Sequence, residues 1–254
     1  MEPILKVENL TKIFSRSGQE NFTAVSGICF DLRPGECLGI IGESGSGKTT
    51  AVNLITRLLD VTEGSILLEG AEITHLKGKE LRKVYRKMQM VFQTPTDSFD
   101  PRRTLGDGIG ESLRNIGMSR KETRKEVERL LGKCGLSADF ADRYPHQVSG
   151  GQCQRAAIAR ALAVKPGILI CDEATSALDV TVQKEILELL NELRSQQGNS
   201  LSILFICHDI SLVQQFCDRV LVMYHGGIVE EGTPNEVIQH PRNAYTQRLI
   251  DSVL

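Results

Sequence analysis

Several features that would place a chain in a special class are missing from this sequence. Its 30 Lys and Arg residues and 32 Asp and Glu residues nearly cancel, which leaves a formal net charge of -2. Nucleic-acid binding depends on a local surplus of positive charge, because contacts with phosphates supply much of the affinity. Since the composition gives no such surplus, we expect no nucleic-acid partner.

Signals for secretion and for membrane insertion are also missing. No apolar run reaches the roughly 18 residues of a spanning helix, and the amino terminus lacks the basic-then-apolar pattern of a signal peptide. The cysteines include no CxxC pair, and most lie inside apolar runs such as ILIC and SILFIC. We therefore predict reduced core thiols in a cytoplasmic protein, for which a partner would supply any membrane contact. These cysteines are Cys29, Cys37, Cys134, Cys153, Cys171, Cys207 and Cys217.

What the chain does contain is a set of short β-branched or aliphatic runs that alternate with helical patterns. Nearly continuous apolarity over so few residues is typical of strands buried on both faces of a parallel sheet. Helical spacing at 48–59 and 182–196 completes the βαβ order, so the sequence predicts an α/β fold with a mostly parallel core sheet. The predicted strands are 37–41, 88–92, 168–171, 202–206 and 219–223.

The character of the sequence changes between about 95 and 165. A capping box of Ser119 and Glu122 opens a segment with apolar residues at helical spacing, which predicts a helical subdomain inserted into the sheet. We find no internal repeat, and two short helices separated by Pro241 are expected at the end of the chain. The predicted division of a single domain is a β core at 1–94 and 166–226, a helical subdomain at 95–165 and a carboxy-terminal segment at 227–254.

The first chemical motif is GESGSGKT at residues 42–49, which matches GxxxxGK[ST] between a predicted strand and a predicted helix. Its glycines let backbone N–H groups wrap phosphate oxygens, Lys48 reaches the β- and γ-phosphates, and Thr49 Oγ binds Mg²⁺. The alternative is an ordinary flexible Gly/Ser turn. The predicted phosphate-binding residues are Gly42, Glu43, Ser44, Gly45, Ser46, Gly47, Lys48, Thr49 and Thr50.

Two carboxylates follow the predicted strand 168–171. Asp172 ends this strand, and open α/β sheets bind ligands beyond the carboxyl ends of their strands, so Asp172 is placed to hold Mg²⁺ directly or through water. Glu173 is placed to polarise the attacking water. A solvated sheet edge or a helix cap would be the ordinary explanation for either carboxylate, but the phosphate-binding loop favours the catalytic one.

Two further polar residues follow neighbouring strands. His208 comes just after 202–206, and we predict that it senses the γ-phosphate, although a lone histidine is more often structural or merely exposed. Gln93 comes just after strand 88–92, so the same argument places it at this sheet edge, with weaker support for a functional role. Gln89 lies inside that strand and is predicted to be structural.

A second anion-binding helix start is predicted at VSGGQ, residues 148–152. Ser149 and Gln152 form an S-x-x-Q capping box, which many ordinary helices have. That explanation leaves Gly150 and Gly151 unexplained, because each glycine costs a helix roughly 1 kcal/mol relative to alanine. A second phosphate-binding helix end without a phosphate-binding loop of its own indicates a nucleotide held across a subunit interface.

Taken in order, GESGSGKTT, VFQ, VSGGQ, ILICDE, SALD and CHD resemble the motifs of nucleotide-binding subunits of ATP-binding cassette (ABC) transporters. The resemblance covers nearly the whole chain and implies a P-loop NTPase fold of the ABC ATPase type, with an additional antiparallel β part. Longer stretches, among them FQTPTDSFDPRRTLGD and HPRNAYTQRLI, resemble ATPase subunits of bacterial dipeptide, oligopeptide and nickel importers.

This resemblance implies ATP and Mg²⁺ as cofactors, with Lys48, Glu173 and His208 as catalytic residues. It implies a head-to-tail dimer in which the signature residues Ser149, Gly150 and Gly151 of one subunit touch the γ-phosphate held by the other, and it counts Gln152 among the nucleotide-binding residues. The loop from Ser176 to Asp179 would cross the same interface. The residues at positions that bind adenine, the metal or the interface in this family are Phe14, Thr49, Gln93, Asp172 and Asp179. For Phe14, a core position at a strand end remains the alternative.

The implied function is the ATP-hydrolysing motor of a bacterial importer of peptides or nickel, peripheral on the cytoplasmic face of the inner membrane. The implied partners are a second ATPase subunit, identical or related, two membrane permease subunits and an extracytoplasmic solute-binding protein. Two alternatives stay open: a soluble ABC ATPase of DNA repair or translation, and a small-molecule kinase. The first usually has long coiled-coil insertions or two fused cassettes, which are not found here, and the second would leave SGGQ and SALD without a role.

Overall fold

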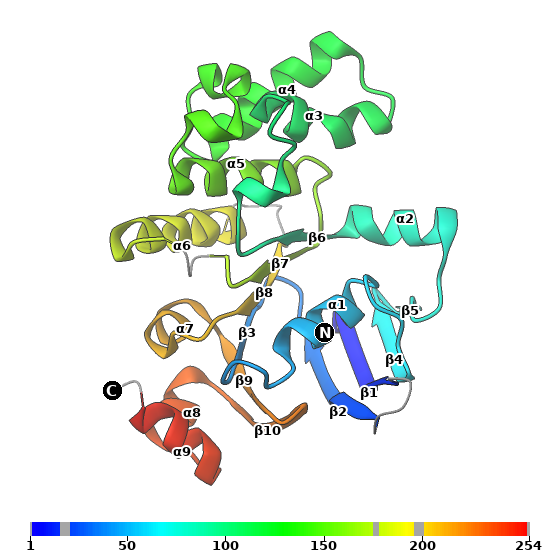
Figure 1. Cartoon of the computed structure of the whole chain (residues 1–254), viewed down its shortest axis with the longest axis vertical. Coiled ribbons are helices and arrows are strands. Elements are labelled where there is room, and N and C mark those ends of the chain that lie inside the picture. Colours follow the sequence, from blue (N-terminus) through cyan, green and yellow to red (C-terminus); the bar gives the residue numbers. More distant parts are fainter. Residues whose placement is uncertain (1, 16–20, 175–177, 196–200, 253–254) are drawn as a thin grey trace.

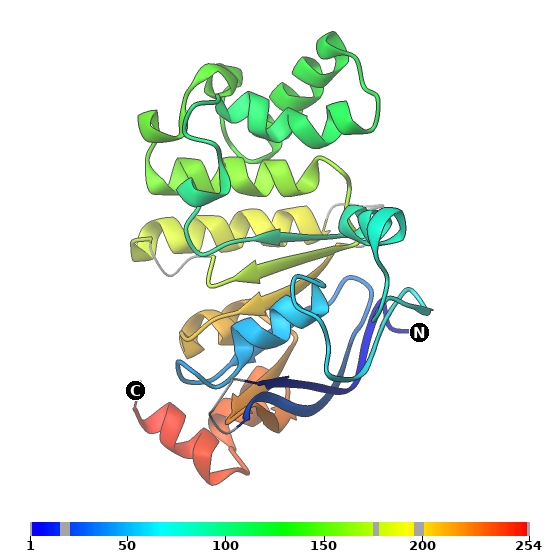
Figure 2. The same ribbon diagram turned by 45° about the vertical axis from the view of Figure 1, so that its right-hand side comes forward.

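The computed structural model describes residues 2–15, 21–174, 178–195 and 201–252. A six-stranded sheet runs through the middle of the molecule, with an antiparallel sheet packed beside it and a group of helices at one end (Figure 1). Turning the molecule by 45° keeps the same order of layers (Figure 2). The fold is α/β, as the sequence predicts.

The central sheet has the strand order β10-β9-β3-β8-β7-β6. Its strands from β9 to β6 are parallel, and β10 pairs with β9 in the antiparallel direction. All of the predicted strands lie in this sheet, whereas β10 falls in the segment for which only helices were expected. The strands are β3 (Cys37–Ile41), β6 (Met88–Val91), β7 (Ile168–Asp172), β8 (Ser202–Ile206), β9 (Arg219–Tyr224) and β10 (Gly227–Gly232).

The second sheet is antiparallel and has the order β2-β1-β4-β5. Its strands carry fewer continuous apolar runs, because one face contacts the core and the other faces solvent. Its individual strands were not predicted. They are β1 (Leu5–Phe14), β2 (Phe22–Leu32), β4 (Glu63–Leu68) and β5 (Ala71–Glu72).

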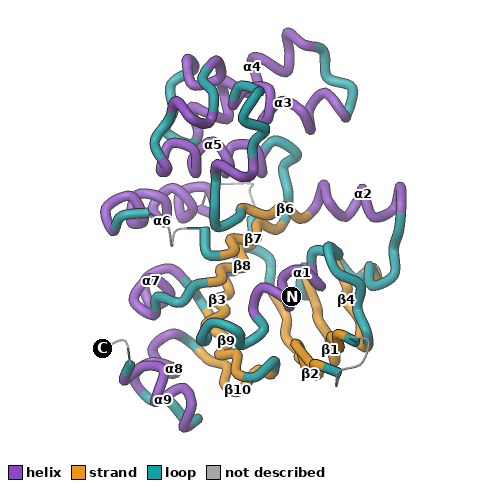
Figure 3. The backbone as a smooth tube through the Cα atoms, viewed as in Figure 1, coloured by secondary structure: helices purple, strands orange, loops and turns teal. Residues whose placement is uncertain are grey.

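Both faces of the central sheet are covered. In β3, Leu38 and Ile40 pack against the antiparallel sheet and α1, whereas Cys37 and Ile41 pack among the helices of the opposite face. Figure 3 shows the central sheet between α6 and α7 on one side and α1 with the antiparallel sheet on the other. The α-helices are α1 (Lys48–Ile55), α2 (Gly78–Lys87), α3 (Leu105–Asn115), α4 (Arg120–Lys133), α5 (Gly150–Leu162), α6 (Val180–Ser195), α7 (Ile210–Phe216), α8 (Pro234–Gln239) and α9 (Ala244–Asp251).

Helices α3, α4 and α5 form the group at the end of the molecule (Figure 1). The predicted capping box opens α4, where Glu122 N donates to Ser119 Oγ at 3.4 Å and Ser119 N donates to a Glu122 carboxylate oxygen at 3.1 Å. Behind this cap, Val127 and Leu131 are buried against the other helices of the group. These helices therefore carry their own apolar core continuous with that of the sheet.

Two local expectations are wrong. Helix α1 ends at Ile55 rather than at residue 59, because Arg57 adopts a left-handed backbone conformation (φ 59°) that a continuing helix does not allow. Cys29 is exposed on β2 and accepts a hydrogen bond from Asn9 N, so it is no core thiol; the other cysteines are buried.

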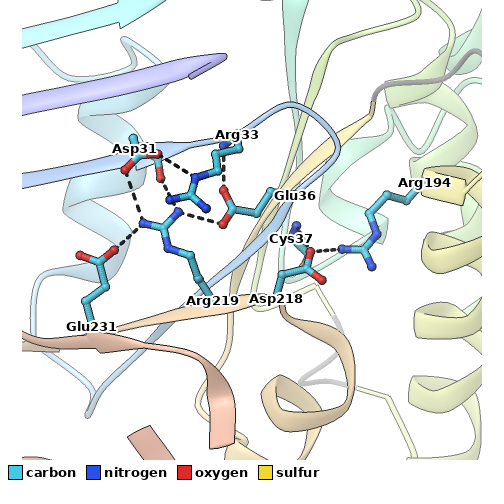
Figure 4. Close-up of polar contacts among 8 residues, drawn as sticks. All are labelled: Asp31, Arg33, Glu36, Cys37, Arg194, Asp218, Arg219 and Glu231. Atoms are coloured by element: carbon cyan, nitrogen blue, oxygen red, sulfur yellow. Dashed lines mark hydrogen bonds and ion pairs between the residues drawn. The ribbon is translucent and has the colours of Figure 1, made fainter. Parts of the chain in front are cut away.

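Charged side chains join the sheets at the amino-terminal ends of the parallel strands (Figure 4). Arg219, the first residue of β9, donates to Glu36 at 2.8 Å and to Asp31 at 3.5 Å, and it also pairs with Glu231 of β10. Its side chain is 13% exposed and that of Glu36 is 7% exposed, so this is the most deeply buried ion pair at this end of the sheet. The network fixes the sheet end that lies opposite the phosphate-binding loop.

Among the described residues, no helix combines the length and the apolar composition that crossing a membrane requires.

Candidate functional site

The carboxyl ends of the parallel strands bring the predicted site residues to one edge of the central sheet. Strands β3, β8 and β7 pair in register, with Asp172 opposite Ile206. The phosphate-binding loop therefore begins beside Glu173 and His208, and Gln93 follows the next strand along the sheet. Because parallel strands end on a common edge, residues far apart in the sequence meet here.

The loop between β3 and α1 has the backbone geometry of a phosphate cradle. Gly45 and Gly47 have φ values of 82° and 105°, which side-chain-bearing residues rarely adopt. A Cβ on Gly47 would lie 2.6 Å from the carbonyl oxygen of Ala24, so a side chain is also excluded by space. Gly47 then caps α1, whose first backbone N–H groups remain open for an anion.

Lys48 lies folded back inside this loop. Its Nζ donates to the carbonyl oxygens of Gly42 at 2.7 Å and Glu43 at 2.8 Å, and the residue is only 5% exposed. Burial lowers the pKa of Lys48, while the charges of Glu173 and Asp172 act in the opposite direction. Backbone oxygens of the loop therefore hold the ammonium group in place.

Asp172 fits the role of a metal ligand. Burial raises its pKa to about 6, and repulsion by Glu173 adds to this, whereas Lys48 opposes it. Its Oδ1 is buried and accepts no hydrogen bond within the described part of the chain. An unpaired buried carboxylate oxygen at a sheet edge is costly unless a cation binds there, and Mg²⁺ prefers oxygen ligands. Thr49 and Gln93, the other predicted ligands, are both exposed at this edge.

Glu173 has an unusual backbone conformation. Its φ of 48° is in the left-handed region, which costs a non-glycine residue of order 1 kcal/mol or more and is found disproportionately at functional sites. Its N–H donates to the carbonyl oxygen of Ile206 at 3.1 Å, which ties the turn to the neighbouring strand. The conformation redirects the chain directly after β7, beside Asp172, and the action of Glu173 on water stays a prediction.

His208 is exposed on the same edge, two residues after the end of β8. Its neighbour Asp209 caps α7 by accepting hydrogen bonds from Ser211 N and Leu212 N, which fixes the backbone on one side. The side chain is thus on the predicted edge, and its γ-phosphate contact stays a prediction. Gln89, predicted to be structural, donates to the carbonyl oxygen of Tyr85 in its own chain.

The signature stretch starts helix α5 with the predicted capping box, in which Gln152 N donates to Ser149 Oγ at 3.3 Å and Ser149 N donates to Gln152 Oε1 at 3.0 Å. Its two glycines differ. A Cβ on Gly151 would lie 2.5 Å from Val182 Cγ1 in α6, whereas one on Gly150 would make only a 3.4 Å contact with Leu178. Among the described residues, packing against α6 therefore explains Gly151, which the capping box left unexplained, whereas no close contact explains Gly150, which is exposed.

Two predicted interface residues follow β7. Asp179 is exposed and accepts a hydrogen bond from Val182 N at 3.0 Å, so it caps the start of α6 within its own chain. Ser176 lies outside the described residues. Phe14 ends β1 and is half-buried, with the Lys12 ammonium 5.2 Å from the centre of its ring. Phe14 is therefore not fully buried in the core, and its stacking on adenine stays a prediction.

Sequence reasoning missed two contacts that reach the loop from the carboxy-terminal part of the chain. Tyr245 of α9 accepts a hydrogen bond from Glu43 N at 3.0 Å, and Gly226 N donates to the carbonyl oxygen of Ser46 at 2.9 Å. Tyr245 lies in the stretch HPRNAYTQRLI, which resembles importer ATPases, and that is the one sequence signal that points to it.

Comparisons with known proteins agree with this geometry. A family model described as "ABC transporter" matches residues 25–176. The oligopeptide transport ATP-binding protein OppF of Escherichia coli is 45% identical over 232 residues, covering 91% of this chain and 69% of OppF. The oligopeptide transport ATP-binding protein AppF of Bacillus subtilis is also 45% identical, over 260 residues that cover 99% of this chain and 78% of AppF.

Solved structures are also similar to this chain. The ATP-binding cassette MJ0796, solved as a dimer in a post-hydrolysis state with ADP and Pi, superposes with a TM-score of 0.81 at 33% sequence identity. The match covers 91% of this chain and 98% of MJ0796. The family match, the sequence identity and the shared fold show that the chain belongs to the ATP-binding proteins of the ABC transporter family.

Proposed function

We propose that this protein is the ATP-hydrolysing motor subunit of a bacterial ABC importer for short peptides. The observation that carries the proposal is the meeting of Lys48, Asp172 and Glu173 at one sheet edge in a chain 45% identical to two oligopeptide transport ATP-binding proteins. Both relatives are named for peptides, which favours peptides over nickel as the cargo. Neither belongs to DNA repair or translation, so the soluble alternative has no support.

The proposed chemistry assigns one task to each residue. The Lys48 ammonium, already positioned by the carbonyls of Gly42 and Glu43, neutralises charge on the β- and γ-phosphates. Thr49, Asp172 and Gln93 would hold Mg²⁺, which when bound stabilises negative charge on the transferring phosphoryl group.

Water activation falls to the residues that follow β7 and β8. Glu173 accepts a hydrogen bond from the attacking water and orients it toward the γ-phosphorus. His208 donates a hydrogen bond to a γ-phosphate oxygen from the same sheet edge. Phe14 stacks on the adenine ring.

The signature helix is proposed to complete the site of a second subunit. Ser149 and Gly150 are exposed at the start of α5, where open N–H groups favour an anion. In a head-to-tail dimer they would face the γ-phosphate held by the partner, with Asp179 and Ser176 beside the same interface. The second subunit is either identical or a related ATPase.

Membrane permeases are proposed to dock on the groove between the β core and the helical group. This groove is lined by apolar side chains that include Leu58, 54% exposed, and Phe92, 42% exposed, next to the strand end that carries Gln93. Exposed apolar side chains of this size in one groove are typical of a protein interface. Two permease subunits and an extracytoplasmic solute-binding protein would complete the importer, with this chain peripheral on the cytoplasmic face of the inner membrane.

The test of the proposal begins with ATP. Lys48→Ala should abolish ATP binding and turnover, because the charge on the β- and γ-phosphates is lost. Lys79→Ala removes an exposed lysine of α2 and is the matched control. Nucleotide affinity is measured on the purified chain, and normal ATP binding by the Lys48 variant would refute the assignment of the loop.

The transport assignment needs a second experiment. Affinity purification of the tagged chain from its own membranes should recover two hydrophobic permease subunits, and Phe92→Asp should release them while ATP affinity stays unchanged. Recovery of a nucleic-acid repair complex or a ribosome in their place would refute the importer assignment.

A further inference from the structure

The carboxy-terminal helix α9 reaches the phosphate-binding loop through a single side chain. Tyr245 is 4% exposed, and its hydroxyl oxygen accepts the hydrogen bond from Glu43 N at 3.0 Å. Glu43 is the second residue of the loop. The contact joins residues 202 positions apart in the sequence.

The N–H group that donates to Tyr245 belongs to the same peptide group as a carbonyl oxygen that accepts a hydrogen bond from Lys48. This group consists of the carbonyl of Gly42 and the N–H of Glu43, and its oxygen accepts from Lys48 Nζ at 2.7 Å. Because a peptide group is planar and rigid, fixing its N–H also fixes the direction of its C=O. Tyr245 and Lys48 are thus coupled through one rigid unit.

The tyrosine is itself firmly held. Its ring stacks on Tyr224 with a centroid separation of 3.9 Å and an interplanar angle of 27°. Its N–H donates to the Asn243 side chain at 2.8 Å, and Glu230 of β10 accepts from Asn243 N at 3.1 Å. The stretch HPRNAYT is therefore attached to the sheet directly before the hydroxyl that meets the loop.

A second contact supports the far end of the same loop. Gly226, in the turn after β9, donates to the carbonyl oxygen of Ser46 at 2.9 Å, and a Cβ at Gly226 would lie 2.9 Å from the carbonyl oxygen of Ala24. The carboxy-terminal part of the chain thus contacts both ends of the loop that surrounds the Lys48 ammonium.

We propose that Tyr245 is a positioning residue for ATP binding: it holds the Gly42–Glu43 peptide so that the Gly42 carbonyl keeps Lys48 aligned for the β- and γ-phosphates. The inference rests on ATP binding at this loop, as proposed above. Tyr245 touches neither ATP nor the reacting atoms in this account, and it acts through the loop backbone.

The test removes, one at a time, the hydroxyl groups of the two stacked tyrosines, Tyr245 and Tyr224. Tyr245→Phe keeps the ring and removes the acceptor, and we expect a loss of ATP affinity of about two- to tenfold, as for one hydrogen bond. KM for ATP should rise by a similar factor in the assembled transporter with kcat little changed, because the contact acts on binding. Tyr224→Phe removes a hydroxyl from the partner ring and should leave affinity and KM unchanged.

Hydrogen exchange reports directly on the hydrogen bond between Glu43 and Tyr245. Hydrogen exchange at Glu43 N should accelerate in Tyr245→Phe, whereas exchange at Ser46 N, which donates to the Glu43 carbonyl oxygen at 3.2 Å, serves as the reference within the same loop. If Tyr245→Phe does not fold, Asn243→Ala frees the Tyr245 N–H and should lower ATP affinity in the same direction.

A tyrosine that only attaches α9 to the core would lower thermal stability and leave ATP affinity and KM as in the wild type, even with faster exchange at Glu43 N; that result would overturn the proposal. Equal losses of affinity in Tyr245→Phe and Tyr224→Phe would overturn it as well. Failure of the proposed function is distinguishable, because the wild type would then bind ATP no better than Lys48→Ala.

Discussion

The substitution Gly151→Ala separates packing from function at the signature helix. The added Cβ would lie 2.5 Å from Val182 Cγ1, much closer than carbon atoms in contact approach, whereas Gly150→Ala makes a 3.4 Å contact with the flexible end of Leu178. Both substitutions replace a glycine in the first turn of α5, so both gain a similar helix propensity of up to about 1 kcal/mol. The difference between them is therefore the clash.

The expected size of that difference follows from overpacking. Inserting one methyl group into a packed contact costs about 1–3 kcal/mol, so Gly151→Ala should be less stable than Gly150→Ala by about that amount. For a domain of this size, each kcal/mol corresponds to a shift of about 2–4 °C in the melting temperature. Urea unfolding of the purified chain, followed by far-ultraviolet circular dichroism, measures the difference directly.

Shortening the opposing side chain gives the control. Val182→Ala removes the Cγ1 atom that the new methyl group meets, so Gly151→Ala should cost less in this background than in the wild type. The coupling in this double-mutant cycle should be about 1–3 kcal/mol. Strictly additive effects, or equal stability of the two alanine variants, would show that Gly151 is not required by packing against α6.

The remaining predictions concern catalysis, the composite site and the ion-pair network. Glu173→Gln should still bind ATP but lose about 10²- to 10⁴-fold in turnover, the usual contribution of a general base; turnover within twofold of the wild type would move the role to another residue. Gly150→Asp should fold and bind ATP at its own loop but lose hydrolysis in the assembled transporter, because a carboxylate would face the partner's γ-phosphate; unchanged turnover per folded molecule would leave SGGQ as a helix cap. Arg219→Met should lower the unfolding free energy by about 3 kcal/mol, because it leaves the Glu36 carboxylate buried without its ion-pair partner. Glu231→Gln removes a more exposed partner and should cost less than about 1 kcal/mol, so equal costs in the two variants would contradict this explanation.

The core of the site was predictable because it depends on short-range patterns. A Gly-rich loop between an apolar strand and a helix, and two carboxylates at the end of another apolar strand, each combine a local motif with strand direction. The rule that parallel strands end on one edge then brings Lys48, Asp172 and Glu173 together without knowledge of the tertiary structure. All three lie there in the structure, and the Asp172 oxygen that has no partner among the described residues adds support for a metal that the sequence alone could not give.

Features that depend on tertiary contacts were harder to predict from the sequence. The antiparallel strands β1 and β2 have one solvated face and β-bulges, so their periodicity is weaker than that of buried strands. The early end of α1 depends on one backbone angle at Arg57. The contact between Tyr245 and Glu43 spans most of the chain, and no local pattern encodes it.

A contact within the chain reduces the evidence that the two signature glycines give for a nucleotide site shared between subunits. Gly151 is needed inside the chain, because Val182 occupies the space where its side chain would be. Its identity therefore says nothing about a second subunit. Gly150 is exposed, and nothing in the described residues approaches closely enough to exclude a side chain there. The case for a shared nucleotide site therefore depends on Gly150 and the neighbouring Ser149.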